Sequence, residues 1–320
     1  MTRLGGLDDL RGIAAIAVLL FHASVEYGTF QLFPFGFLAV DFFFALSGYV
    51  MARCYEPRMR EGGGAGFVAE RIGRFWPMML VGALLGLPLL VAQVGPTAIP
   101  VAVLNLLLIP VPAVHSTFPV DAPFWSLHYE LVANAAHALW FWRLRTRPML
   151  ALIGALAVAM MAVTYAHDGY SVGPIMSSYL PGLLRTALAY LIGVWLYRVW
   201  QDEPSLRVPP ALAYLALPLA LFAIGRGPFE ALFWQPLFVV VAVPLVMAGG
   251  IAASGSVRLL GDLSFPLYVV HYPIITSACW LGLPMWSAIH VSLVLAAAIA
   301  RLPLATWRWR PTPRVARQPR

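Results

Sequence analysis

The chain consists largely of long apolar runs that follow one another with only short polar breaks. Inside a bilayer the backbone N–H and C=O groups find no water, so runs of this length cross the membrane as helices. The apolar segments lie near residues 10–27, 35–53, 76–94, 124–142, 149–166, 179–198, 210–225, 231–250, 263–281 and 286–304. The sequence therefore predicts an all-α polytopic membrane protein with about ten transmembrane helices.

The composition fits a single membrane domain. Hydrophobic residues make up 61% of the 320 residues and charged residues only 11%, whereas a soluble domain carries about 25% charged residues. We therefore expect one integral-membrane domain over residues 1–320, with an arginine-rich tail from about 305 to 320. The net charge of +7 does not indicate nucleic-acid binding, because the arginines gather at helix ends. No pair of histidines has the spacing of a metal site, so we expect no bound metal.

The charges of the loops predict the orientation of these helices. The loop from about residue 53 to 75 carries five arginines, the loop from about 95 to 123 carries none, and only Arg226 breaks the alternation. The positive-inside rule then places both termini in the cytoplasm, as for a multi-pass protein of the inner (cytoplasmic) membrane. The apolar stretch 97–114 is interrupted by three prolines, so we interpret it as a re-entrant or interfacial segment.

Five ionisable side chains lie inside the predicted spans, each on a different helix. Each is eleven to thirteen residues from the arginine at the cytoplasmic end of its helix, which is roughly 16–20 Å at 1.5 Å per residue. They are His22, Asp41, Glu130, Arg185 and His271. Ionisable groups are costly at membrane depth and usually functional there, so we expect these five to form one cluster.

The expected cluster has the groups needed for acid–base chemistry. Asp41 and Glu130 can neutralise Arg185 and hydrogen-bond a histidine, and a carboxylate on one imidazole nitrogen leaves the other nitrogen as a base. Two other interpretations remain open. The same groups can form a structural ion-pair cluster, or the proton relay of a secondary transporter. A transporter is expected to contain inverted repeats with broken helices, and the sequence shows no internal repeat.

A second concentration of charge lies at the predicted cytoplasmic surface. Arg71 and Arg74 are three residues apart and share a helix face, and Arg11 lies near the same surface. Arg11 and His22 also share a face, because eleven residues make three helical turns plus about 20°. Forked guanidinium groups can bind phosphate oxygens, although topology signalling or lipid contact is the alternative for any one arginine. The pair aligned with His22 predicts a polyanionic cytosolic donor.

Five motifs, in order along the chain, resemble those of the membrane acyltransferase-3 family. The first helix carries a basic residue, ten residues and a histidine, from Arg11 to His22, and Arg71 and Arg74 form an Arg-x-x-Arg element. The others are Phe-Phe-Ala-Leu-Ser-Gly at 43–48, Trp-Ser-Leu-x-x-Glu at 125–130, and GDLSFPLYVVHYP at 261–273. The resemblance extends from residue 7 to about 300. The family often ends in a Glu-Arg-Pro-like element, whereas this chain has Trp-Arg-Pro at 309–311 and lacks the glutamate.

The resemblance implies a ten-helix enzyme that moves an acyl group, commonly acetyl, from cytosolic acyl-CoA to a hydroxyl of a cell-envelope glycan. Acyl-CoA is then a donor substrate rather than a permanently bound cofactor. Arg71 and Arg74, with help from Arg11, are expected to bind the coenzyme A phosphates.

A hypothesis that joins the arginine cluster with the intramembrane cluster gives the five intramembrane groups expected roles. His22 acts either as a base or as a transient acyl carrier, and His271 is the alternative base. Asp41 or Glu130 orients the imidazole, and Arg185 stabilises the developing oxyanion.

Overall fold

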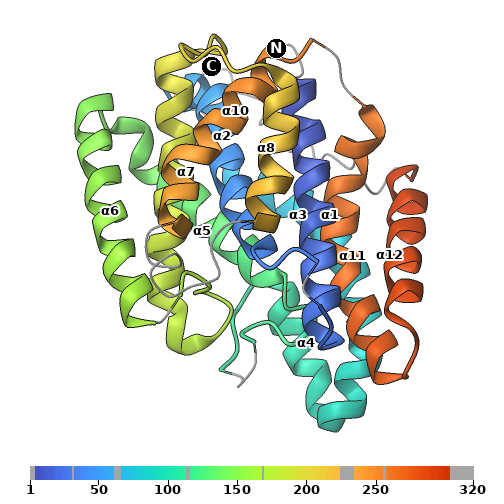
Figure 1. Cartoon of the computed structure of the whole chain (residues 1–320). Helices are drawn as coiled ribbons and strands as arrows, with labels where there is room; N and C mark the ends of the chain where they lie inside the picture. The colour runs from blue at the N-terminus through green and yellow to red at the C-terminus, as the bar shows by residue number, and fades with distance from the viewer. Residues whose placement is uncertain are drawn as a thin grey trace, which may run out of the picture.

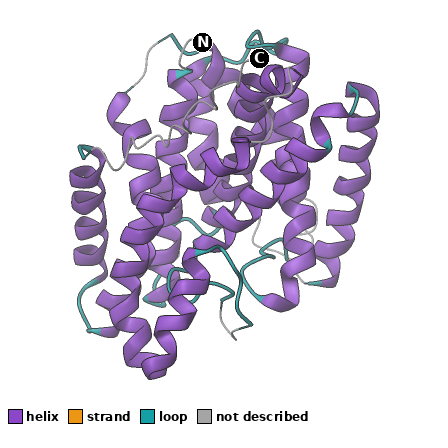
Figure 2. Cartoon of the chain, turned by 180° about the vertical axis from the view of Figure 1, so that it is seen from behind, coloured by secondary structure: helices purple, strands orange, loops and turns teal. Residues whose placement is uncertain are grey.

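The computed structural model describes residues 4–30, 32–60, 66–112, 116–167, 169–223, 234–254 and 257–302. Within these ranges the chain forms helices and no strand (Figure 2). The prediction of an all-α protein is therefore confirmed. Arg226 and the arginine-rich tail predicted near 305–320 lie outside the described residues.

The helices form one bundle, with α6 at one edge and α12 at the opposite edge (Figure 1). They are α1 (Gly5–Glu26), α2 (Ala39–Arg60), α3 (Phe67–Val94), α4 (Ala98–Leu106), α5 (Phe124–Leu139), α6 (Thr146–Ala166), α7 (Tyr179–Trp200), α8 (Pro210–Ala223), α10 (Val243–Ala252), α11 (Arg258–Trp280) and α12 (Met285–Ala300). A π-helical turn, Phe238–Ala242, leads into α10.

Five helical runs among the described residues are long and apolar enough to cross a membrane. They are Gly36–Arg60, Phe67–Leu106, Thr146–Ala166, Met176–Trp200 and Trp234–Ala252. Large apolar side chains such as Leu84 and Val158 are exposed on the outside of the bundle, as expected for contact with lipid. The start of α1 and the end of α12 point toward the same end of the bundle (Figure 1). Ten transmembrane helices and cytoplasmic termini remain predictions.

Two helices continue beyond the apolar segments expected from the sequence. α2 ends at Arg60 rather than near residue 53, and α3 begins at Phe67 rather than near residue 76. Hydropathy marks the part of a helix that can face lipid, whereas α3 starts earlier because Phe67, Arg71 and Phe75, spaced by four, are buried inside the bundle. Arg71 and Arg74 therefore lie in the first turns of α3.

The described part of the stretch 97–114, residues 97–112, forms one short helix, α4, rather than a span of its own. α4 has nine residues, about 14 Å of helix, and follows a turn at Gly95, whose φ of +66° favours glycine. The segment after α4 is held by Asn105, whose Nδ2 donates to the carbonyl oxygen of Thr117 and whose Oδ1 accepts from the amide of Val120. This returning segment leads into the first turn of α5, beside α11.

Two close helix pairs form the frame around the polar groups. α2 packs along α7, and α1 packs along α11. A Cβ added at Gly48 on α2 would collide with the carbonyl oxygen of Tyr190 on α7. A Cβ added at Gly12 on α1 would lie 2.5 Å from the carbonyl oxygen of Leu260 on α11. Glycine at these positions therefore lets the helix backbones approach each other closely.

Candidate active site

Two histidines face each other across the contact between α1 and α11. Nδ1 of His22 lies 2.9 Å from Nε2 of His271, and the two ring centroids are 5.1 Å apart. Nδ1 of His271 lies 2.9 Å from the carbonyl oxygen of Leu267, one turn earlier on α11. His271 is fully buried, whereas His22 is partly exposed.

The hydrogen bonds of this pair determine which nitrogens carry protons. The carbonyl oxygen of Leu267 can only accept, so Nδ1 of His271 carries its proton, and Nε2 of a neutral His271 is an acceptor. Nδ1 of His22 must then donate to that acceptor. The remaining nitrogen of a neutral His22, Nε2, is left without a proton and can act as a base or a nucleophile.

The partner of His22 differs from the one expected. Among the described residues neither Asp41 nor Glu130 hydrogen-bonds His22, and His271 takes the place foreseen for a carboxylate. The edge of the Tyr272 ring packs on His22, with the centroids 5.2 Å apart. The hydroxyl of Tyr272 donates to Oε1 of Glu26, one turn beyond His22 on α1.

Asp41 and Arg185 form a separate buried ion pair. Nη2 and Nε of Arg185 donate to the carboxylate of Asp41 at 2.7 and 3.0 Å, and both side chains are almost completely buried. The guanidinium group also donates to the carbonyl oxygens of Val172 and Phe37. These contacts join α2, α7, the loop at Val172 and the short 3-10 helical turn Gly36–Leu38. They use four of the five N–H groups of Arg185, so its guanidinium group is committed mainly to this ion pair rather than to the oxyanion role that we expected.

Glu130 pairs with Arg71 rather than with Arg185. Oγ of Ser47 donates to Oε1 of Glu130 at 2.6 Å, and Nη2 of Arg71 lies 3.3 Å from the same carboxylate oxygen and 3.3 Å from Ser47. These contacts bring α2, α3 and α5 together. Arg71 is only 4% exposed, so it lies deeper in the bundle than the surface position expected from the sequence.

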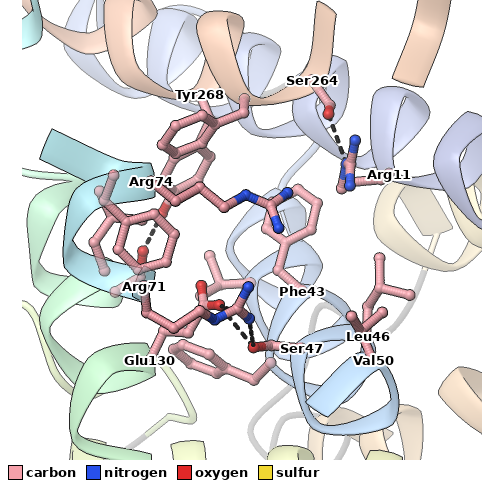
Figure 3. A pocket seen from close by; sticks show the side chains of 16 residues that line it. Arg11, Phe43, Leu46, Ser47, Val50, Arg71, Arg74, Glu130, Ser264 and Tyr268 are labelled. Carbon is pink, nitrogen blue, oxygen red and sulfur yellow. Dashed lines mark hydrogen bonds and ion pairs between the residues drawn. The ribbon is translucent and has the colours of Figure 1, made fainter. Parts of the chain in front are cut away.

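A pocket of about 150 Å³ lies among α1, α2, α3, α5 and α11. The three arginines predicted to bind a polyanion, Arg11, Arg71 and Arg74, all contribute to its wall (Figure 3). Arg11 is hydrogen-bonded to Ser264 and to the carbonyl oxygen of Gly261. Within the described part of the chain, no hydrogen bond or ion pair engages Arg74, so its guanidinium group is available to a ligand.

The rest of the pocket wall is mainly apolar. It includes Phe43, Phe44, Leu46, Val50, Phe75, Leu127 and Phe265. Arginines beside an apolar wall can hold an anionic group attached to a less polar chain. No three histidine, cysteine, aspartate or glutamate residues in the described ranges gather as a metal site would require.

Tyr268 connects the pocket to the histidine pair. Its side chain lines the pocket, and its ring centroid lies 5.9 Å from that of His271, three residues later on α11. Its hydroxyl lies 2.6 Å from Oγ of Ser126 at the start of α5. Tyr268 lies within the motif at 261–273, but sequence reasoning assigned it no role, although its spacing of three residues before His271 places both on one helix face.

Comparisons with known proteins agree with the motif pattern. A family described as "Acyltransferase domain" matches residues 4–307. The chain is 29% identical over 284 residues to the exopolysaccharide production protein ExoZ of Rhizobium meliloti (strain 1021), covering 79% of this chain and 80% of that protein. It is 25% identical over 321 residues to acyltransferase MdmB of Streptomyces mycarofaciens, covering 86% and 80%. It is 31% identical over 176 residues to protein 2 in the picA locus of Rhizobium radiobacter, covering 48% and 91%. No solved structure matches.

Proposed function

We propose that this chain transfers an acetyl group from cytosolic acetyl-CoA to a hydroxyl of a cell-envelope glycan. The proposal starts from the family: the chain belongs to the membrane acyltransferase-3 family and is an acyltransferase. The relative ExoZ, whose name refers to exopolysaccharide production, supports a glycan as the acceptor. The predicted orientation supports the inner membrane as the site of the reaction, with the donor on the cytoplasmic side and the acceptor on the other.

One observation carries the proposal. Tyr268 lines another part of the wall of the pocket that contains the three arginines, and its ring lies beside the ring of His271 in the histidine pair. The 3′-phosphate and the pyrophosphate of coenzyme A would bind Arg74 with help from Arg11 and Arg71. The pantetheine arm would lie along the apolar wall. The thioester would then be presented toward His22.

In the proposed step His22 is the reactive base. Its unprotonated Nε2 takes the proton of the acceptor hydroxyl while that oxygen attacks the thioester carbonyl carbon. The C–S bond breaks, and the coenzyme A thiolate receives the proton from His22, so the imidazole returns to its neutral form. His271 is a positioning residue, because its contact with Leu267 fixes the tautomer of both rings.

Release of free thiol from radiolabelled acetyl-CoA tests this function. We expect purified protein in lipid nanodiscs, supplied with crude cell envelope, to release coenzyme A and to transfer label to the envelope. His22→Ala should abolish both, whereas His290→Ala, which changes an exposed histidine on α12, should abolish neither. Wild-type protein that neither binds nor consumes acetyl-CoA or longer acyl-CoA would refute the proposal.

Two further measurements separate the alternatives. If His22 carries the acyl group, label should remain on the wild-type protein when no acceptor is present, and His22→Ala should remove it. A proton-coupled transporter would instead show proton flux in proteoliposomes without release of thiol.

A further inference from the structure

Acyl transfer requires a donor for the oxygen of the reacting carbonyl, which becomes negatively charged when the nucleophile attacks. Arg185, the residue expected in this role, is bound to Asp41 and to two backbone carbonyl groups, and it does not line the pocket. The donor should therefore lie between the arginine-lined pocket and the histidine pair. Tyr268 is the polar side chain that contacts both.

The hydrogen bonds of Tyr268 show where its proton points. Oγ of Ser126 lies 3.0 Å from the carbonyl oxygen of Pro123, which can only accept, and the hydroxyl of Tyr268 lies 3.5 Å from the same oxygen. The shorter contact indicates Ser126 as the donor to Pro123. In this arrangement the hydroxyl of Tyr268, 2.6 Å from Ser126, donates to Oγ of Ser126. Ser126 thus holds a tyrosine O–H in the wall of the pocket, and a hydroxyl can rotate toward a better acceptor without moving its ring.

The start of α5 supplies a partial positive charge beside this position, which also has Glu130 in the same pocket wall. Ser126 lies in the first turn of α5, where the aligned peptide dipoles produce a partial positive charge. The ring of Tyr268 is fixed by Phe43, whose ring meets it edge-on with the centroids 5.6 Å apart. Tyr268 is 6% exposed, so its hydroxyl acts in a site from which most water is excluded.

We propose that the hydroxyl of Tyr268 donates the hydrogen bond that stabilises the carbonyl oxygen of the thioester during acyl transfer, and that Ser126 is its positioning residue. This inference rests on the proposed function. Tyr268 keeps its own proton throughout. It shares that proton with the oxyanion, which re-forms the C=O bond when the C–S bond breaks and the thiolate leaves.

Tyr268→Phe removes the hydroxyl and keeps the ring. We expect kcat for acetyl-CoA to fall roughly 10²–10³-fold, the range for loss of one oxyanion donor, with no change in the Kd of coenzyme A. The matched control is Tyr190→Phe, which removes the hydroxyl of another buried tyrosine that bonds Asn134 and does not line the pocket. Ser126→Ala should cost less than Tyr268→Phe, because the tyrosine hydroxyl remains.

A comparison of donors separates an oxyanion role from a structural one. Trifluoroacetyl-CoA has a more electrophilic carbonyl carbon and needs less stabilisation of its oxyanion, so the loss caused by Tyr268→Phe should be smaller with this donor. An equal loss with both donors, or a kcat equal to that of Tyr190→Phe, would overturn the assignment.

If Tyr268→Phe does not elute from gel filtration as a folded protein, Ser126→Ala must show the donor-dependent loss, and its absence would overturn the assignment. Wild-type protein that consumes no donor would refute the proposed function itself.

Discussion

Nδ1 of His22 on α1 lies 2.9 Å from Nε2 of His271 on α11, and this contact joins two motifs about 250 residues apart in the sequence. Since His271 is itself bound to the carbonyl oxygen of Leu267, the contact fixes the proton positions of both rings. His271 therefore does for His22 what a carboxylate does in many acid–base sites, without bringing a negative charge into the membrane.

Substitutions of His271 should separate its positioning role from a role in packing. His271→Gln offers a side-chain carbonyl oxygen that can still accept from Nδ1 of His22, whereas His271→Leu offers no acceptor. We expect the leucine variant to lose roughly 10²-fold or more in kcat, within the range of general-base catalysis, and the glutamine variant to lose less. Steady-state kinetics with the Kd of coenzyme A measured in parallel would test this. Equal losses in both variants would argue that His271 only fills space.

Arg74 and Arg71 should differ in their effects, because only Arg71 has a carboxylate partner in the described part of the chain. Arg74→Ala removes a guanidinium group that is available to a ligand, so we expect the Kd of coenzyme A to rise about tenfold, as for one charge-assisted hydrogen bond. Arg71→Ala removes a partner of Glu130 and should also lower the midpoint of thermal unfolding. Isothermal titration with coenzyme A and with 3′-dephospho-coenzyme A would show which phosphate Arg74 binds. An unchanged Kd for Arg74→Ala would contradict its role in donor binding.

The sequence predicts the helices of this molecule and the faces they present better than the side-chain contacts between helices. Apolar runs predict the helices, and the spacing from Arg11 to His22 correctly places both on the face of α1 that contacts α11. Asp41 and Arg185 lie at similar distances from the cytoplasmic ends of their helices, and this similarity also predicts that they pair. These features depend on the rise and the period of one helix, which a sequence defines directly.

The remaining contacts depend on how each helix is rotated and where it begins. Glu130 meets Arg71 because α3 starts before the apolar segment and carries Arg71 into the bundle. The distance of each residue from the cytoplasmic end of its helix predicts a contact between Glu130 and Arg185, and a contact between His22 and a carboxylate. Neither contact is formed, because depth leaves the rotation of a helix about its own axis undetermined. The contact of Tyr268 with Ser126 likewise requires the returning segment before α5.

The ion pair of Asp41 and Arg185 should contribute mainly to stability. Asp41→Asn leaves the guanidinium charge buried without its counter-charge, so we expect a loss of about 3–5 kcal/mol in the free energy of unfolding. The double variant Asp41→Leu/Arg185→Leu removes both charges and should be more stable than Asp41→Asn. Thermal unfolding in detergent would measure both. A double variant less stable than the single one would show that the pair contributes more than mutual neutralisation.

Gly48 and Gly154 offer a matched test of the contact between α2 and α7. A Cβ at Gly48 would collide with the backbone oxygen of Tyr190, which cannot rotate away, so Gly48→Ala must push the two helices apart. Overpacking of this kind costs about 1–3 kcal/mol. Gly154 on α6 is exposed and has no atom near its added Cβ, so Gly154→Ala should be neutral or more stable by up to about 1 kcal/mol, because alanine favours helix.

The two free cysteines provide the measurement for this pair of variants. Cys54 and Cys279 are partly buried and unpaired, so a thiol-reactive dye should report unfolding as they become accessible. We expect the midpoint of Gly48→Ala to fall and that of Gly154→Ala to stay level or rise. Because α2 carries Ser47, which bonds Glu130, separation of α2 from α7 should also disturb the wall of the pocket and weaken coenzyme A binding. Equal midpoints for the two variants would mean that the helices can part without cost, and that the close approach at Gly48 does not hold the pocket in place.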